Sequence, residues 1–462
     1  LELFTRLAMA VGEPVMRWSV TSGLQRLDLE LQPQTHAKDP QQALGHIKAT
    51  GTPGIYVLLD FHPYLEDPGH IRMIKEIALG YGEAQHTLVF ISHTCELPEE
   101  LRAFSARFDL ALPDHEALEA WIREEAKKWS QAHPGRRVKT DSVTLARLVH
   151  QLRGLTETDA RRLVRNAIHD DGAITEADLP QVTKLKYELL DQSGILSFEF
   201  DTVRFAEVGG LERLKRWLGQ RKDAFVAADA MLDPPKGILL VGVQGGGKSL
   251  AAKAVAGLWQ LPLLRLDFGT LYNKFFGETE RNLRNSLRTA EAMAPCVLWV
   301  DEIEKAIASG DYDSGTSKRV LGTLLTWLAE RDQPVFLVAT ANRIDALPPE
   351  LIRKGRLDEI FFVDLPDAVV RSQIFDIHLR KRGQNVQAFN LDELARRSDG
   401  FSGAEIEQAI VAALYLAREQ RRPLDIGHLL MELEQTRPLS VVMAEQLTAP
   451  REWARHRTVA AN

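Results

Sequence analysis

VGVQGGGKSLAAK, residues 241–253, places three adjacent glycines directly before a lysine and a serine. The spacing G-x-x-x-x-G-K-[ST] of a phosphate-binding loop is satisfied by Gly242, Gly247, Lys248 and Ser249. The apolar run KGILLVG precedes the loop and the helical pattern SLAAKAVAG follows it, so the loop joins a strand to a helix as the motif requires. A glycine-rich connector that ended in Lys-Ser by chance would not need these neighbours. The stretch therefore predicts an α/β domain that binds the phosphates of a nucleotide.

Each part of this loop has a chemical role in the prediction. Glycines allow consecutive backbone N–H groups to converge on a phosphate at the positive N-terminus of the following helix. Lys248 would reach the β- and γ-phosphates, and the Ser249 hydroxyl would bind Mg²⁺. We therefore expect a nucleotide and Mg²⁺ as cofactors, with the nucleotide contacted by Gly242, Gly245, Gly246, Gly247, Lys248, Ser249 and Leu250.

A second motif follows about fifty residues later in CVLWVDE, residues 296–302, an apolar strand that ends in two carboxylates. Beside a phosphate loop, Asp301 is placed to bind Mg²⁺ through water and Glu302 to polarise the attacking water. The strand VFLVATAN, residues 335–342, then brings Asn342 to its tip, where an amide could orient the same water. The structural alternatives are an ordinary strand end and an asparagine that only forms a turn. The combination predicts hydrolysis of the nucleotide rather than binding alone.

Composition limits the classes of protein to which the chain can belong. With 462 residues it is long enough for several domains, and 45% hydrophobic and 26% charged residues are typical of a globular protein. The net charge of −7 gives no general attraction for nucleic acid or anionic lipid, so both are disfavoured partners. No apolar run approaches the ~20 residues that cross a bilayer, so we expect no membrane segment.

The two cysteines indicate the compartment. Cys95 and Cys296 each lie inside an apolar run, which predicts two buried thiols in a reducing environment. No signal-peptide pattern opens the sequence, and a cytoplasmic protein is expected. Because the sequence starts at Leu1 rather than methionine, we also expect further residues before it.

Three segments of the N-terminal half repeat patterns of the C-terminal half in the same order. The pairs are 54–63 with 295–304, 87–114 with 335–367, and 148–168 with 394–414. Chance similarity would explain one such pair more readily than three. We therefore interpret the N-terminal half as a degenerate copy of the nucleotide-binding half. We predict four domains: an α/β domain without a nucleotide site (1–130), a small helical domain (131–192), a large α/β ATPase domain (193–370), and a helical lid with a C-terminal tail (371–462).

The motifs together resemble a known family. FAEVGGLERLKRWL, GVQGGGKS, LYNKFFGETERNLR, VLWVDEIEKAIA, VATANRIDALPPELIRKGRLDE and GFSGAEIEQAI occur in the order found in AAA ATPases of the narrow, Cdc48- and FtsH-like group. This likeness covers residues 200 to about 435. LGTLLTWLAE, IRKGRLDEIFFVDLPD and TRPLSVVMAEQ are more particularly similar to the uncharacterised AAA proteins first described as a chloroplast open reading frame. The fold class that the resemblance implies is a P-loop AAA+ module, a parallel sheet with flanking helices and a helical lid, preceded by a degenerate AAA-like module.

The resemblance also implies site residues that spacing does not give. Its adenine-contacting turn corresponds to Val208 and Gly209, and its lid contacts to the nucleoside correspond to His378, Gly403 and Ala404. The paired arginine fingers, which act on the nucleotide of a neighbouring subunit, correspond to Arg353 and Arg356. The aromatic loop that lines a central pore corresponds to Phe275, Phe276 and Gly277. The plainer alternatives are a basic helix end for the arginines, an ordinary helix histidine for His378 and core aromatics for the phenylalanines.

Some positions depart from the family pattern. Val243, Gln244 and Gly246 replace the usual Pro-Pro and Thr of the phosphate loop, and the lost rigidity costs about 0.5–1 kcal/mol in ordering the loop. Glu207 stands where Asp is usual. The N-terminal copy has no G-K-[ST], and Asp60 is followed by Phe61 rather than by Glu. That half is therefore expected to bind no nucleotide for hydrolysis.

These expectations combine into one function and two alternatives. The preferred function is ATP-driven remodelling or unfolding of a protein substrate by a homo-oligomeric ring, which we expect to be a hexamer because arginine fingers act only across a subunit boundary. The first alternative is an ATP-switched scaffold that recruits partners through the N-terminal half without threading a chain. The second and weaker alternative is a nucleic-acid translocase, which the negative charge and the lack of a basic stripe disfavour.

Overall fold

The structure is a computed structural model of the 462-residue chain. It describes residues 3–4, 6, 14–27, 37–92, 97–108, 112–169, 171–191, 194–200, 207–226, 232–273, 279–306, 314–343, 347–352, 355–442, 444–455 and 457–462. The chain divides into two compact units, Leu1–Ala111 and Leu112–Asn462. Among the residues just given, no helix is both long enough and apolar enough to span a bilayer.

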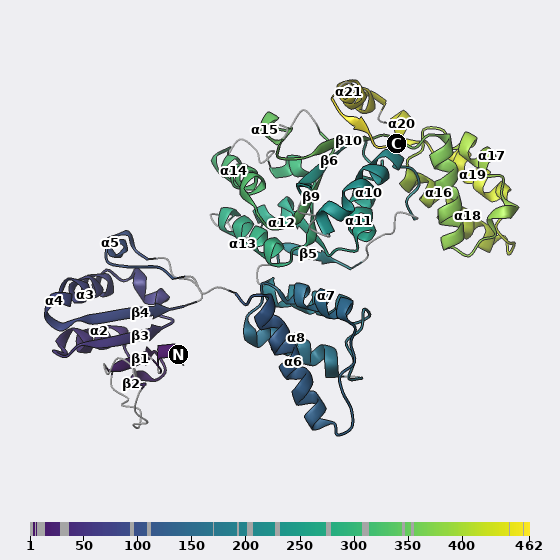
Figure 1. The fold of residues 1–462 in the computed structure, drawn as a ribbon. Helices are drawn as coiled ribbons and strands as arrows, with labels where there is room; N and C mark the ends of the chain where they lie inside the picture. The colour runs from purple at the N-terminus through teal and green to yellow at the C-terminus, as the bar shows by residue number, and fades with distance from the viewer. Residues whose placement is uncertain are drawn as a thin grey trace. The chain divides into compact units, whose positions relative to one another are not determined.

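The first unit is a four-stranded sheet with helices packed against it (Figure 1). Its strand order is β2-β1-β3-β4, in which β1 and β2 form an antiparallel hairpin and β1, β3 and β4 run parallel. The strands are β1 (Val15–Ser19), β2 (Gly23–Arg26), β3 (Gly54–Leu59) and β4 (His86–Ile91). The helices are α2 (Pro40–Ala49), η1 (His62–Glu66), α3 (Pro68–Leu79), α4 (Tyr81–Ala84) and α5 (Glu99–Arg102). The centre of the core is formed by the fully buried Trp18, Ile47, Leu58 and Phe61.

The second unit begins with a helical subdomain. It consists of α6 (His115–Ala132), α7 (Ser142–Leu152), α8 (Glu157–His169) and α9 (Leu179–Leu190). The sequence prediction assigned residues up to 130 to the N-terminal domain, whereas α6 contributes Leu118 and Ile122 to the apolar core that α7 and α8 also line. The reason is that α6 is one continuous amphipathic helix whose apolar face packs into the core of this subdomain.

A seven-stranded sheet forms the centre of the second unit, in the order β11-β10-β6-β9-β8-β7-β5. Only β5 runs antiparallel to its neighbour, and all other pairs are parallel. The strands are β5 (Leu196–Glu199), β6 (Gly237–Gly242), β7 (Leu263–Asp267), β8 (Cys296–Asp301), β9 (Val335–Ala341), β10 (Glu359–Val363) and β11 (Val459–Ala460). Every residue of β6 and β9 is buried, as expected for central strands that are covered on both faces.

Helices cover both faces of this sheet, with α10 and α11 on one side and α12 to α14 on the other (Figure 1). Their bounds are α10 (Glu212–Val226), α11 (Lys248–Trp259), α12 (Phe268–Asn273), α13 (Thr279–Ala292), η3 (Ile303–Ala306), α14 (Ser314–Glu330) and α15 (Pro349–Ile352). Cys296 is fully buried beneath them, as predicted, and burial raises the pKa of its thiol to about 12. Cys95 lies outside the described residues.

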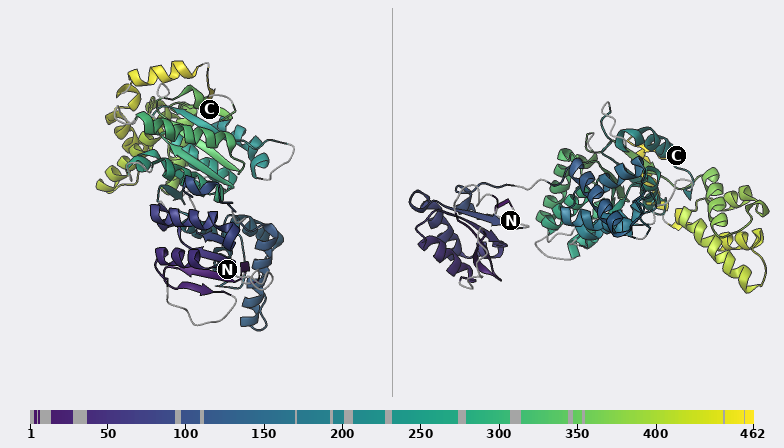
Figure 2. Two further views of the ribbon diagram at one scale, coloured as in Figure 1. Left: turned by 90° about the vertical axis from the view of Figure 1, so that its left-hand side faces the viewer. Right: turned by 60° about the horizontal axis from the view of Figure 1, so that its bottom comes forward.

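The remaining helices include a lid bundle with a core of its own, drawn in yellow-green in Figure 2. They are α16 (Ala368–Lys381), η4 (Val386–Ala388), α17 (Leu391–Arg397), α18 (Gly403–Glu419), α19 (Ile426–Gln435), α20 (Leu439–Val442) and α21 (Ala444–Ala454). Asp367 caps α16, because its side chain accepts a 2.9 Å hydrogen bond from the Val370 amide. Phe375 and Ile410 are fully buried in this bundle.

The two sheets share part of their topology. The order and directions of β2-β1-β3-β4 match those of β5-β7-β8-β9, with one antiparallel pair followed by two parallel pairs. The turn between α7 and α8 and the turn between α17 and α18 also match, because Gly154 (φ +83°) and Gly400 (φ +77°) both take the left-handed conformation. These likenesses support the interpretation of the N-terminal half as a degenerate copy. Within the described part of the first unit, no strand stands beside β4 where β6 stands beside β9.

Candidate active site

The phosphate loop connects β6 to α11, as the sequence predicts. Gly242 has φ +148°, and a Cβ there would lie 2.0 Å from the Val363 carbonyl oxygen of the neighbouring strand β10. Gly247, at φ +97°, is the residue before the first turn of α11. Only glycine accepts these backbone angles and this close approach without strain. The loop therefore depends on glycine for its shape as well as for access to its amides.

Lys248 is folded back onto the loop in this conformation. Its side chain is buried, and its Nζ donates hydrogen bonds of 2.9 Å and 2.7 Å to the carbonyl oxygens of Gly242 and Val243. Burial lowers the pKa of Lys248 to about 8, while the nearby Glu304, Glu302 and Asp301 act in the opposite direction. Two carbonyl groups therefore hold the ammonium at the loop. A bound phosphate would take their place as its hydrogen-bond partner.

Asp301 ends β8 at the same edge of the sheet. Its Oδ1 accepts a 2.7 Å hydrogen bond from the Thr340 hydroxyl on β9, and its Oδ2 forms a 2.8 Å ion pair with Arg265 on β7. The three strands are parallel neighbours, so their carboxyl ends lie together. Ligands of open α/β sheets bind outside this edge, which is where the sequence predicted the carboxylate.

Glu302 adopts a left-handed backbone conformation, with φ +49°. A non-glycine residue pays on the order of 1–3 kcal/mol for such angles, and residues of this kind concentrate at functional sites. Its Oε1 accepts a 2.9 Å hydrogen bond from the Asn342 side-chain amide, and its Oε2 pairs with Lys305. The structure therefore brings together Glu302 and Asn342, which the sequence placed at the tips of two different strands.

Three further residues at this edge were missed in the sequence. Thr340 is buried in β9 and joins two of the predicted residues, because its hydroxyl also accepts a 3.0 Å hydrogen bond from the Glu302 amide. Arg265 stacks on the Trp299 ring at 4.7 Å from the ring centre. Glu304 accepts a 2.9 Å hydrogen bond from the Asn342 backbone amide. A signal was present, since Thr340 and Arg265 are polar residues inside apolar strand sequences.

The oxygen donors at the site fit a magnesium ion. Ser249 is exposed in the first turn of α11, and Asp301 offers a carboxylate at the end of β8. One carboxylate oxygen of Glu304 is buried and has no hydrogen-bond partner among the described residues. Hydroxyl and carboxylate oxygens are the ligand types that Mg²⁺ takes in nucleotide sites, usually together with waters. The other predicted phosphate contacts, Gly245 and Leu250, are also exposed in the loop and the first helical turn.

The residues predicted to contact the nucleoside come from the turn before α10, from α16 and from the start of α18, and these meet at Ile374. A Cβ on Gly209 would lie 3.0 Å from Ile374 Cγ1, and a Cβ on Gly403 would lie 3.6 Å from Ile374 Cδ1. Ile374, on α16, therefore packs between the turn before α10 and the start of α18. A cavity of about 450 Å³ beside it is lined by Val208, Gly209, Glu212, Lys215, Ser372, Gln373, Asp376, Ile377 and Leu391. Sequence reasoning missed Ile374, which was indistinguishable from a core residue of its helix.

His378 lies one turn further along α16 and is mostly buried. Arg382 Nη1 is 3.2 Å from its Nδ1, and Glu407 Oε1 is 3.4 Å from the same nitrogen. Burial lowers the pKa of His378, while Glu407 opposes the shift. The imidazole is therefore favoured in its neutral form, with Nδ1 as acceptor for the guanidinium. Ala404 is exposed at the start of α18.

The remaining predicted residues are placed less completely. Phe275, Phe276, Gly277 and Arg353 lie outside the described residues. Arg356 is described: its Nη1 donates a 2.7 Å hydrogen bond to the Glu350 carbonyl at the start of α15. The pore role of Phe275, Phe276 and Gly277 and the arginine-finger role of Arg353 and Arg356 therefore stay predictions from the resemblance. Arg356 is partly exposed.

The chain matches four family models that follow one another along it. They are described as "SpoVK-like AAA ATPase, N-terminal domain" (residues 1–110), "SpoVK-like AAA ATPase, second domain" (116–193), "ATPase family associated with various cellular activities (AAA)" (238–365) and "AAA+ lid domain" (388–430). The solved "FIGL-1 AAA domain" superposes with a TM-score of 0.51 at 24% identity, over 59% of this chain and 95% of that one, which is a likeness of fold. The fold class predicted from the sequence is confirmed: the phosphate loop, the parallel sheet and the lid make this protein an AAA ATPase.

Relatives identify the family within that class. The "uncharacterized AAA domain-containing protein ycf46" of Trieres chinensis is 37% identical over 424 residues, covering 90% of this chain and 84% of the relative. The protein of the same description from Guillardia theta is also 37% identical, over 90% of this chain and 82% of the relative. The chain belongs to the ycf46 family of AAA domain-containing proteins. The "proteasome-activating nucleotidase" of Aeropyrum pernix is 38% identical over 248 residues, which cover 51% of this chain and 60% of that protein.

Proposed function

We propose that the chain hydrolyses Mg²⁺-bound ATP as a subunit of a ring and uses the energy to remodel or unfold a protein substrate. The observation that carries the hydrolytic part is the contact between Glu302 and Asn342 at the carboxyl ends of β8 and β9, next to the strand that leads into the phosphate loop. A carboxylate held at this edge by an amide from the neighbouring strand can accept a proton from a water near the γ-phosphate.

Each residue of the site has a proposed role in binding or hydrolysis. Lys248 exchanges its carbonyl partners for the β- and γ-phosphates, and the loop glycines present their amides to the same groups. Ser249 and Asp301 hold the Mg²⁺, which neutralises charge on the phosphate oxygens when it is bound. Glu302 orients and polarises the attacking water, and Asn342 keeps the Glu302 carboxylate in place. Thr340 positions both acidic residues through its hydroxyl.

The nucleoside is proposed to bind between the turn that holds Val208 and Gly209 and the lid residues His378, Gly403 and Ala404. The support is that Ile374 touches the positions of both glycines, so the turn and the lid form adjoining walls. A neutral His378 suits contact with an uncharged base better than an imidazolium would. Binding at this place would also connect the nucleotide to the position of the lid.

The proposed assembly into a ring, which we propose is a hexamer, rests on the two predicted arginine fingers, Arg353 and Arg356. Arg353 and Arg356 follow a short helix at a distance in sequence from the phosphate loop, and we propose that they act on the nucleotide of a neighbouring subunit. An arginine finger of this kind contributes ~10³–10⁵ in rate in related phosphoryl-transfer enzymes. Similarity to the proteasome-activating nucleotidase, whose name connects that protein to a proteasome, supports a role in the handling of proteins.

The pore residues provide the test that separates remodelling from an ATP-switched scaffold. Phe275→Ala is expected to leave basal ATP hydrolysis near the wild-type rate, because Phe275 is not among the residues proposed to contact the nucleotide. The same change should abolish the stimulation of ATP hydrolysis, and the unfolding, of a chemically destabilised fluorescent test protein. The matched control is Phe200→Ala, which removes a phenylalanine elsewhere in the chain. Phe200 is 61% exposed.

The outcomes distinguish three interpretations. Retained unfolding by Phe275→Ala would contradict threading through these aromatics and favour the scaffold. Loss of folding, seen as a lost thermal transition, would show that Phe275 is a core residue. Stimulation of the ATPase by single-stranded nucleic acid rather than by the test protein would favour the translocase.

A further inference from the structure

The backbone amides of the turn before α10 donate hydrogen bonds to acceptors outside the turn. Gly210 and Leu211 both have left-handed backbone conformations, with φ +72° and φ +62°. The first turn of a helix also leaves amides without partners inside the helix. The segment from Gly210 to Leu214 therefore needs acceptors from elsewhere in the chain, and four of its amides have them.

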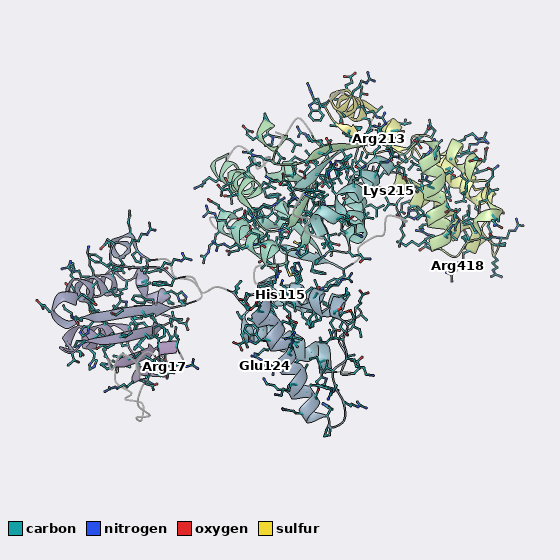
Figure 3. The ribbon with its side chains drawn as sticks, in the orientation of Figure 1. Arg17, His115, Glu124, Arg213, Lys215 and Arg418 are labelled. Atoms are coloured by element: carbon teal, nitrogen blue, oxygen red, sulfur yellow. The ribbon has the colours of Figure 1, made fainter. Side chains whose placement is uncertain are left out.

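Three of these four hydrogen bonds are accepted by Ala461 and Asn462. The Leu211 amide donates to the Asn462 side-chain oxygen, and the amides of Arg213 and Leu214 donate to the Ala461 carbonyl at 3.1 Å and 3.2 Å. Figure 1 shows this end of the chain beside α10, and Figure 3 labels Arg213 on that helix. The N-terminus of α10 is thus capped by residues about 250 positions away in sequence.

The capping segment is itself fixed in the sheet. β11 pairs with β10 through Val459 and Ala460, and the Ala461 amide donates a 3.0 Å hydrogen bond to the Phe362 carbonyl. Ala461 is fully buried in the core between the sheet and α10. Residues 459–462, which we name the tail strand, therefore connect a rigid element to the turn.

The lid holds the same turn as well. Gln373 on α16 accepts a 2.9 Å hydrogen bond from the Gly210 amide. A Cβ on Gly210 would lie 2.7 Å from the Asn462 side-chain oxygen and 2.8 Å from Val370 of the lid, so no side chain fits between them. The turn is therefore clamped between the tail strand and the lid, and its other face lines the cavity with Val208 and Gly209.

We infer that Asn462 is a positioning residue for the nucleoside of ATP. Asn462 is not proposed to touch the nucleotide. Its side chain accepts the hydrogen bond from the Leu211 amide and so holds the turn in place. Val208 and Gly209 of this turn form one wall of the proposed nucleoside site. This inference rests on the proposed nucleoside site and adds to it the element that holds its wall in place. Because the tail strand is paired in the sheet, it ties this wall of the nucleoside site to the sheet.

The test compares two ligands that share phosphates but not a nucleoside. Asn462→Ala removes the acceptor of one hydrogen bond, so the dissociation constant for ATP should rise about fivefold. The dissociation constant for inorganic tripolyphosphate, measured by competition, should not change, because it contacts only the phosphate loop. Asn462→Asp keeps an oxygen acceptor at the same place and should bind ATP as tightly as the wild type does.

Gly209→Ala serves as the comparison that tests the nucleoside site itself, since its Cβ would press on Ile374. If Asn462→Ala binds ATP normally while Gly209→Ala binds it weakly, the role of Asn462 is overturned and the nucleoside site stands. If both variants bind ATP normally, both the role of Asn462 and the nucleoside site are overturned. Equal weakening of ATP and tripolyphosphate by Asn462→Ala would show a general loss of structure, and it too would overturn the inference. Because Asn462 is exposed, the variants are expected to fold, which a thermal unfolding curve checks.

Discussion

Lys248 combines burial with a charge on which nucleotide binding depends. Its pKa is lowered to about 8 by burial, and its ammonium satisfies two loop carbonyls in the absence of a phosphate partner. A polyphosphate favours the charged form of the lysine, so its pKa is higher in the complex than in the free protein. Binding above pH 8 must therefore be accompanied by uptake of a proton.

This linkage predicts how ATP affinity varies with pH. Below pH 8 Lys248 is already charged, and the dissociation constant for ATP should be constant. Above pH 8 it should rise by up to about tenfold per pH unit, because the free protein has lost a proton that the complex retains. Calorimetry at pH 9 in two buffers of different ionisation enthalpy should detect uptake of close to one proton, and the same titration at pH 7 should detect none. A constant affinity up to pH 9.5 would show that Lys248 keeps its proton in the free protein.

At the scale of secondary structure, the site depends on the alignment of β8 with β9. Their parallel pairing places Val300 opposite Ala339, and so brings Asp301 level with Thr340 at the next position. Apolar runs predicted both strands and the residues at their tips, Glu302 and Asn342. The hydroxyl of Thr340 could not be assigned a role from the sequence, because it depends on which residue of the neighbouring strand lies opposite.

Thr340→Val tests this alignment, because it replaces the hydroxyl with a methyl group of similar size. Two hydrogen bonds are lost, so the free energy of unfolding should fall by about 1–3 kcal/mol. The turnover number should fall by one to two orders of magnitude, as a displaced catalytic group does, while the dissociation constant for ATP stays near the wild-type value. Thr340→Ser restores the hydroxyl and should restore turnover. If the valine variant turns over at the wild-type rate, Asp301 and Glu302 do not need this support.

The sequence predicted the central sheet of the second unit better than the C-terminal strand β11 and the domain boundary near residue 130. The phosphate loop and the strands next to it have local signals in glycine spacing and apolar runs, and the structure has them where expected. β11 has no such signal, because two residues show no periodicity and their pairing depends on β10 lying beside them. The prediction at residue 130 differs from the observed units for a related reason: the amphipathic pattern of α6 does not say which core its apolar face joins.

At the scale of the whole molecule, the backbone after strand β3 of the first unit can be compared with the backbone after strand β8 of the second. β3 and β8 each lie between two parallel strands, and the residue after each of them has a left-handed conformation: Asp60 with φ +51° and Glu302 with φ +49°. The first unit has no glycine-lysine loop in its sequence, and within its described residues no counterpart of β6. The same local backbone is therefore expected to support hydrolysis in one unit and not in the other.

The rate of ATP hydrolysis by Glu302→Gln, measured beside Asp60→Asn in the full chain, tests this most directly. Glu302→Gln keeps every phosphate contact, so it should bind ATP with a dissociation constant close to that of the wild type. Its turnover should fall by at least ~10²-fold, the lower end of what a general base contributes. Asp60→Asn, the same carboxylate-to-amide change at the residue of the first unit that shares the left-handed backbone, should turn over as the wild type does. Hydrolysis by Glu302→Gln at the wild-type rate, or an equal loss in Asp60→Asn, would contradict a single hydrolytic site at the ends of β8 and β9.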